Sequence, residues 1–386
     1  MKKRVLGVKK DIFLLGIVSF LTDVSSEMIF SVFSIFFTVI LGASILLFAL
    51  AEGLADFSAS SLDYISGVIS EKTGKKKIFT VFGYGFSTAA KLIIAFKSTI
   101  PSAFVFRVIE RFGKSIRGPP RDAWIGAIAE KSNRGYSFAM HKSLDRAGAI
   151  LGPLIAFFVL SRLGETLSSF KVLFQIALIP AILSVVLLFI IKDKPSKPQK
   201  INLRNGYKNL SKELKHYIFA SAVFSLAYFS FSFLLLKAYL VGFQIKEVAL
   251  LYMIFNLSLV IASPIIGKVG DKIGRKKIIT LEYIIYFIIS TGFIFAYSKY
   301  QVIILLMLFG VFYAIDESQS KAYITDLEKK KRAVAIGTYN FIMGLIYLPA
   351  SLIAAALWKI DPNYTFVFAS VISLVALVLF MSRTKR

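Results

Sequence analysis

Long apolar stretches alternate with short polar segments along nearly the whole chain of 386 residues. A bilayer core about 30 Å thick requires roughly 20 apolar residues in each helix that crosses it. The pattern therefore predicts an all-α membrane protein with twelve transmembrane helices. The predicted helices lie near residues 12–40, 44–69, 78–97, 101–129, 136–161, 168–191, 217–241, 247–267, 278–297, 301–324, 333–358 and 364–382.

The polar segments divide the chain and orient it. The longest of them, residues 193–215, is basic and contains Pro195 and Pro198. We predict that it is a cytoplasmic linker, with a short surface helix near its end, between two six-helix bundles at residues 1–192 and 216–386. Lys and Arg gather in this linker, in both tails and in alternate loops. Because cytoplasmic loops carry the excess of these residues, both termini are predicted to be cytoplasmic.

Composition supports a membrane protein and excludes several kinds of site. The mean hydropathy is +0.71 and 56% of the residues are hydrophobic. The chain has no Cys and only two His, so we expect no disulfide, no metal centre and no cofactor. No Ser–His–Asp spacing points to an enzyme. The predicted cytoplasmic segments account for most of the net charge of +25, so we interpret that charge as a topology signal and expect membrane lipid, not nucleic acid, as a partner.

The two halves of the chain repeat one another. "GVISEKTGKKKIFT" begins at Gly67 and "GKVGDKIGRKKIIT" begins at Gly267, and the two align without a gap. Their shared Gly, Lys and Thr positions predict two related bundles of six helices. Such repeats, with a site between them near the middle of the membrane, are typical of secondary transporters.

The stretch "G-x-x-x-D-K-x-G-R-K-K" from Gly267 to Lys277 resembles the signature loop of the major facilitator superfamily, which recurs between helices 2 and 3 and between helices 8 and 9. The first copy has Glu71 where the family usually has Asp. The resemblance covers essentially the whole chain and implies alternating access by two rocking bundles. It also implies that the two loops gate access, although they could mark topology alone. The candidate gating residues are Gly67, Glu71, Gly74, Lys75, Gly267, Asp271, Gly274 and Arg275.

One predicted helix carries an unusual density of charge. "RVIERFGKSIRGPPRDAW", residues 107–124, has five cations and two carboxylates. On a helical wheel these charges fall within an arc of about 140°. Because an unpaired charge in a membrane costs several kcal/mol, we expect this face to meet a water-filled cavity and acids of neighbouring helices. Pro119 and Pro120 predict a kink or a break. The candidate cavity residues are Arg111, Lys114, Arg117, Arg121, Asp122, His141, Lys142, Asp145 and Arg146.

Two further motifs concern coupling and packing. Asp23 and Glu27 lie one turn apart on the first predicted helix. The resemblance to drug:proton antiporters of the superfamily implies proton coupling by such an acid with a helix 4 arginine, here Arg107. Alternatively, all these charges are structural ion pairs. "GAILGPLIAF", from Gly148, resembles the G-x-x-x-G-P antiporter motif, with Gly148, Gly152 and Pro153 as its residues, although small residues four apart also serve plain helix packing.

Together these features predict a monomeric secondary transporter in the cytoplasmic membrane of a prokaryote. Its expected activity is proton-coupled efflux of a small organic molecule, so the partners are a small-molecule substrate, protons and membrane lipid. Two alternatives stay open. The cations of helices 4 and 5 are compatible with a symporter or exchanger of an organic anion. A receptor or assembly factor that does not transport could use the same fold.

Overall fold

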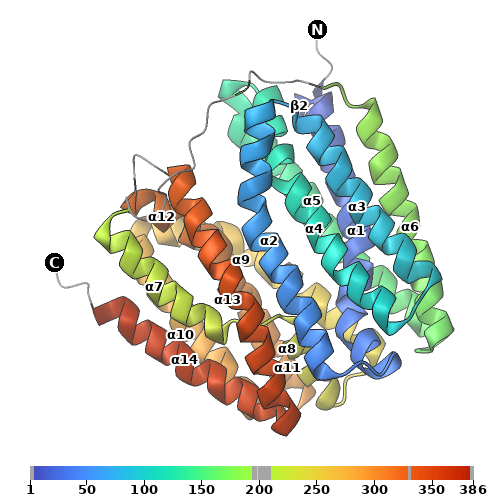
Figure 1. The fold of residues 1–386 in the computed structure, drawn as a ribbon, viewed down its shortest axis with the longest axis vertical. Helices are drawn as coiled ribbons and strands as arrows, with labels where there is room; N and C mark the ends of the chain where they lie inside the picture. The colour runs from blue at the N-terminus through green and yellow to red at the C-terminus, as the bar shows by residue number, and fades with distance from the viewer. Residues whose placement is uncertain (1–3, 194–197, 199–209, 329–331, 383–386) are drawn as a thin grey trace. The chain divides into compact units, whose positions relative to one another are not determined.

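The computed structural model describes residues 4–193, 198, 210–328 and 332–382 (Figure 1). In the N-terminal half, a short antiparallel hairpin precedes the helices. Its elements are β1 (Arg4–Val5), β2 (Val8–Lys9), α1 (Lys10–Ile35), the π-helix η1 (Phe36–Ile40), α2 (Ile45–Thr73), α3 (Lys76–Phe96), α4 (Ile100–Ile128), the short 3-10 helix η2 (Lys131–Asn133), α5 (Arg134–Leu163) and α6 (Leu167–Ile190).

The C-terminal half has the same order of long helices, with two interruptions. Its elements are α7 (Lys212–Ala227), α8 (Ser232–Leu240), α9 (Ile245–Ile273), α10 (Arg275–Ile294), α11 (Lys299–Ile315), the π-helix η4 (Asp316–Ser320), α12 (Lys321–Leu327), α13 (Arg332–Ile360) and α14 (Pro362–Ser382). The predicted linker 193–215 lies mostly outside the described residues, and α7 begins near its end. The predicted surface helix around residues 206–217 is described only where α7 begins.

Among the described residues, eleven helical segments are long and apolar enough to cross a membrane. This finding confirms the predicted helical membrane fold. The predicted fourth span corresponds to α4, which is a helix of 29 residues but too rich in charge to qualify by composition. That α4 also spans the membrane therefore stays a prediction.

The predicted repeat is visible in the positions of the helices. Helices α2 and α9 each contain 29 residues and begin 200 positions apart, at Ile45 and Ile245. Both helices end at a left-handed glycine, Gly74 with φ 72° and Gly274 with φ 93°. Only glycine adopts this backbone conformation without steric cost, so the matched glycines set the turn into the next helix in each half.

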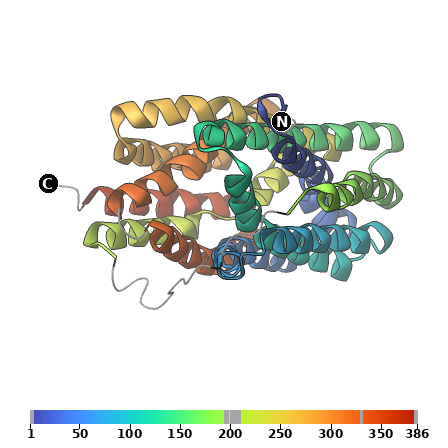
Figure 2. The ribbon, with the colours of Figure 1, turned by 90° about the horizontal axis from the view of Figure 1, so that it is seen from above.

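By packing, the chain forms two compact units that interleave along the sequence. Unit 1 comprises residues 1–43, 62–201 and 245–253, and unit 2 comprises residues 44–61, 202–244 and 254–386, so α2 and α9 each contribute to both. In unit 1, α1 packs against α5 and α6, and α3 packs against α4, as Figure 1 and the view from above in Figure 2 show. In unit 2, α14 packs against α7 and α10.

Helix α4 continues through Pro119 and Pro120, so of the predicted kink or break, the break does not occur. A proline inside a helix leaves the carbonyl four residues earlier without its usual N–H donor. For Pro119 that carbonyl belongs to Ser115. The hydroxyl of Ser66, on α2, donates a hydrogen bond of 2.7 Å to it. A side chain from a neighbouring helix thus replaces the missing backbone donor, which is how membrane helices tolerate proline.

Glycines bring α3 and α4 into backbone contact. A Cβ atom added at Gly83 would lie 2.6 Å from the carbonyl oxygen of Gly113 and 2.7 Å from the backbone nitrogen of Arg117. Backbone atoms cannot move aside as a flexible side chain can. The charged residues of α4 are therefore held against α3 by the absence of a side chain at Gly83.

We expect Gly83→Ala to lower the free energy of unfolding by about 1–3 kcal/mol, since the added methyl group overpacks this contact. Thermal unfolding of the purified protein in detergent measures the effect. Gly85→Ala is the matched control, because a Cβ at Gly85 of the same helix meets nothing within 4 Å. Equal midpoints for the two variants would show that α3 and α4 do not touch at Gly83.

Candidate functional site

The acidic pair predicted on α1 lies where α5 approaches most closely. Asp23 is half-buried and Glu27 is 7% exposed. A Cβ atom added at Gly148 would lie 3.0 Å from the Cβ of Asp23, and one at Gly152 would lie 2.6 Å from the carbonyl oxygen of Val24. Pro153 is buried beside Gly152. The glycine motif of α5 therefore fixes the segment of α1 that carries both acids.

Asp23 lies among charges of both signs. Its electrostatic neighbours are the acids Glu27 and Asp145 and the cations Lys91, Lys114 and Arg117. Four helices, α1, α3, α4 and α5, supply these groups. The structure thus brings together candidates that the sequence placed on separate helices.

Glu27 has a different environment from Asp23. Its carboxylate accepts a hydrogen bond from the side chain of Tyr252, in the segment of α9 that belongs to unit 1. Its Oε2 atom is buried and has no hydrogen-bond partner among the described residues. One carboxylate oxygen of Glu27 therefore accepts a hydrogen bond, and the other is available to a proton or to a hydrogen-bond donor.

The charged face of α4 divides into a buried part and an exposed part. Arg107, Glu110 and Arg117 are buried, whereas Lys114 and Asp122 are exposed. Arg111 and Arg121 are intermediate. The sequence predicted one face on a cavity, but half of that face is packed into the protein.

Arg107 and Arg111 lie beside aromatic rings of α1. The guanidinium carbon of Arg107 is 4.6 Å from the ring centre of Phe30, and that of Arg111 is 5.4 Å from the same ring. A cation over an aromatic face is stabilised by the ring quadrupole. Phe30 lies seven residues, or about 10 Å along the helix, beyond Asp23. Lys114 and Arg117, farther along α4, act electrostatically on Asp23.

Helix α3 supplies partners that the sequence-based selection of site residues did not include. Arg117 donates a hydrogen bond to the hydroxyl of Ser87, and its guanidinium carbon is 4.6 Å from the ring centre of Tyr84. Lys91 is fully buried and donates to Ser26 of α1 at 2.9 Å. Tyr84, Ser87 and Lys91 are spaced as one helical face, and this spacing could have identified them.

The Ser26 hydroxyl connects two of the buried charges. It accepts the bond from Lys91 and donates one of 3.3 Å to Oε1 of Glu110. The Lys91, Ser26 and Glu110 side chains thus form a chain of hydrogen bonds across α3, α1 and α4. Oε2 of Glu110 is buried without a hydrogen-bond partner among the described residues.

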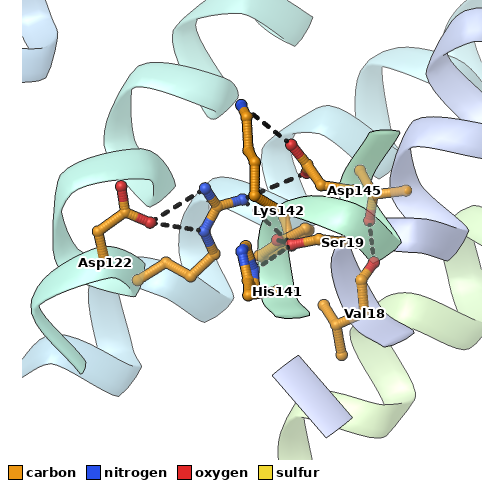
Figure 3. Close-up of polar contacts among 9 residues, drawn as sticks. Val18, Ser19, Asp122, His141, Lys142 and Asp145 are labelled. Carbon is orange, nitrogen blue, oxygen red and sulfur yellow. Dashed lines mark hydrogen bonds and ion pairs between the residues drawn. The ribbon is translucent and has the colours of Figure 1, made fainter. Parts of the chain in front are cut away.

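A second cluster surrounds Ser19, nearer the start of α1. The Ser19 hydroxyl is 2.9 Å from Nε2 of His141 and 3.0 Å from the hydroxyl of Tyr84, and it accepts a bond of 3.1 Å from Arg121. Figure 3 shows Ser19 and His141 facing one another at the centre of this cluster. A single hydroxyl therefore joins α1, α3, α4 and α5.

Ion pairs surround this cluster, as Figure 3 also shows. Arg121 pairs with the neighbouring Asp122 at 3.1 Å and lies 3.8 Å from Asp145. Lys142 lies 3.5 Å from the other oxygen of Asp145. Asp145 therefore links this cluster to Asp23, of which it is an electrostatic neighbour. Arg146, the remaining candidate on α5, is intermediate in exposure.

The two candidate gating loops differ in their contacts. In the second copy, Arg275 binds Asp271 at 3.4 Å and Asp326 of α12 at 2.7 Å. In the first copy, Glu71 is half-buried and Lys75 is exposed. A Cβ atom at Gly67 would lie 3.2 Å from Cβ of Pro119, whereas one at Gly267 would meet nothing within 4 Å.

Comparison with known proteins identifies the family. The sequence model described as "Major Facilitator Superfamily" matches residues 15–296 and, in a second match, 218–386. The chain belongs to the Major Facilitator Superfamily. An MFS-type transporter of Methanocaldococcus jannaschii is 38% identical over 377 residues, 96% of this chain and 94% of that protein. This superfamily member is thus a multi-pass membrane transporter of a small-molecule substrate, and not an enzyme.

One more distant relative and one solved structure are also similar to this chain. "Multidrug resistance protein 2" of Bacillus subtilis is 25% identical over 334 residues, 81% of this chain and 80% of that protein. A crystal structure of the nucleoside transporter NupG matches with a TM-score of 0.79 over 98% of this chain and 100% of that one. Its sequence identity is 14%, so this likeness concerns the fold alone.

Proposed function

We propose that this superfamily member exports small organic solutes in exchange for protons, and that Asp23 carries the proton. The position of Asp23 is the observation that carries the proposal. It is a half-buried carboxylate within an apolar helix, with two acids and three cations as electrostatic neighbours. Ionisable groups in such positions are expensive in a membrane and mark ion pathways.

The arrangement provides a physical route to coupling. A nearby cation favours the ionised form of a carboxylate, and a nearby acid favours its protonated form. Lys114 and Arg117 lie on α4, and Asp145 lies on α5. A shift of α4 relative to α1 during alternating access would change the balance between these groups and load or release a proton at Asp23. Glu27, one turn farther along α1, acts in the same exchange. So does Arg107 of α4, which lies over Phe30, about two turns beyond Asp23 on α1.

The proposal includes a topology and a gate. Helix α4 is the fourth of twelve spans, both termini are cytoplasmic, and the bundles 1–192 and 216–386 alternate within a monomer in a prokaryotic cytoplasmic membrane. The pair of Arg275 with Asp326, at 2.7 Å, is the contact that would hold one access state in the second bundle.

The name of the Bacillus subtilis relative supports export of organic molecules.

A second candidate is transport of an organic anion, and one observation favours it. Lys114 on α4 and Lys142 on α5 are exposed, so their ammonium groups can meet an anion. Exchange or symport of an anion would use these cations without protonation of Asp23. The direction of the driving pH gradient distinguishes the two candidates.

Proteoliposomes with a lumen more acidic than the medium test the proposal. The probes are ethidium, an organic cation, and carboxyfluorescein, an organic anion. Export by proton exchange predicts that ethidium accumulates in the lumen until nigericin collapses the gradient. Accumulation of carboxyfluorescein under the reverse gradient would support the second candidate. Failure to move either probe would count against both and favour a receptor without transport.

A further inference from the structure

The interior of unit 2 contains a pocket that is both acidic and aromatic. Its lining comes from α7, α10, η4 and α13 and consists of five tyrosines, one phenylalanine, two serines, Glu282 and Asp316. No Lys or Arg is among these lining residues. The pocket therefore differs in kind from the charged helices of unit 1, where cations and acids alternate.

Glu282 is the least expected residue of this pocket. It lies within the apolar helix α10, is 2% exposed, and its Oε2 atom has no hydrogen-bond partner among the described residues. Its electrostatic neighbour is a second acid, Asp316. Lys321 interacts with Asp316, but it is exposed and does not line the pocket. An acid buried in a membrane helix is ionised only beside a cation, and the side chains that line this pocket do not supply one.

Two irregular helical segments meet at this pocket. Helix α7 ends at Ala227, Tyr228 caps it, and α8 begins only at Ser232. Asp316 is the first residue of the π-helix η4, which interrupts the span formed with α11 and α12. Broken helices and π-helical turns in membrane proteins are concentrated where a ligand is bound. Both interruptions place a lining residue, Tyr228 or Asp316, at the pocket.

The aromatic rings around the acids form a continuous packed group. Phe224 stacks on Tyr283 with ring centres 4.4 Å apart and planes inclined by 15°. Tyr228 lies 5.8 Å from Tyr347 and 6.4 Å from Phe224. Tyrosine and phenylalanine faces attract alkylammonium groups through the ring quadrupole, and aromatic cages are the usual sites for quaternary ammonium ligands.

We propose that this pocket binds the ammonium group of an organic cation, with Glu282 as its counter-ion, Asp316 as a second acid and the tyrosine rings around its alkyl substituents. That the bound cation is also the exported solute rests on the function proposed above. Binding itself does not, since it requires only the groups of unit 2. No single sequence motif marks this site, because its chemistry is spread over four elements.

Titration calorimetry of the purified full-length protein in detergent, with benzyltrimethylammonium as the probe, tests the proposal. The wild type is expected to bind the probe, and Glu282→Gln is expected to weaken binding at least tenfold. Asp316→Asn and Tyr347→Leu should each weaken it as well. Asp11→Asn, which changes the first turn of α1 in unit 1, should bind like the wild type. Thermal unfolding of each variant establishes that it is folded.

Three outcomes would overturn the proposal. One is the absence of probe binding to the wild type, and another is binding of the probe with wild-type affinity by folded Glu282→Gln and Asp316→Asn. Displacement of the probe by sodium chloride with no effect of Tyr347→Leu would also overturn it, in favour of an inorganic cation. A wild type that transports under a pH gradient but does not bind the probe would reject this site alone. A wild type that binds the probe but shows no pH-driven transport would reject the proposed function alone.

Discussion

Replacement of Gly148 by leucine is expected to prevent α5 from packing against α1 and to cause the largest loss of stability of any substitution considered. A Cβ atom at this position already collides with the carbonyl oxygen of Phe20 and lies 3.1 Å from the backbone nitrogen of Val24. Both neighbours are backbone atoms of a buried helix, so they cannot rotate away. Overpacking by a few methylenes costs about 1–3 kcal/mol, and leucine adds four carbon atoms.

The expected result is a folded yield and a thermal midpoint far below those of the wild type, measured by size-exclusion chromatography after heating. Gly148→Ala should give an intermediate loss. Gly135→Ala is the matched control, because Gly135 lies in the same helix and a Cβ there meets nothing within 4 Å. Removal of a helical glycine at such an open position is neutral or slightly stabilising. A Gly148→Leu protein as stable as Gly135→Ala would contradict the close packing of α1 and α5.

Substitution Asp23→Asn is expected to abolish transport driven by a pH gradient while leaving exchange of the probe across the membrane. Asparagine keeps the size and polarity of the side chain but cannot carry a proton. Reorientation of the loaded protein then no longer depends on protonation at this site. The two measurements are ethidium accumulation under a pH gradient and the exchange of labelled for unlabelled ethidium at equal pH.

The matched control is Asp11→Asn, which makes the same chemical change in the first turn of α1. This variant should retain both activities. Loss of exchange as well as of accumulation in Asp23→Asn would assign this acid a role in packing or in solute binding. Full pH-driven accumulation by Asp23→Asn would remove it from the coupling reaction.

The sequence predicted the helices well because membrane thickness imposes a length on each apolar segment. The predicted segment 44–69 corresponds to α2, Ile45–Thr73, and the repeat found from Gly67 and Gly267 corresponds to helices of equal length. The hairpin of Arg4–Val5 with Val8–Lys9 was not predicted, since strands of two residues have no periodicity.

Other features depend on neighbours that a single helix does not reveal. The continuation of α4 through Pro119 depends on a hydroxyl from Ser66, which lies 53 positions earlier in the chain. A helical wheel gives the direction of a side chain but not what it meets, so the burial of Arg107 and Arg117 beside exposed Lys114 was not predictable. The pocket of unit 2 was not predicted, because its tyrosines do not stand out from the apolar residues of a hydrophobic segment.

The most direct test of proton exchange is the pH of the lumen while a solute moves. Proteoliposomes contain the pH dye pyranine, begin with equal pH on both sides, and receive an inward gradient of ethidium under a voltage clamped by potassium and valinomycin. Exchange predicts that the lumen becomes alkaline as ethidium enters, and that it does not in Asp23→Asn. Entry of ethidium at the wild-type rate with a constant or falling lumen pH would contradict proton exchange.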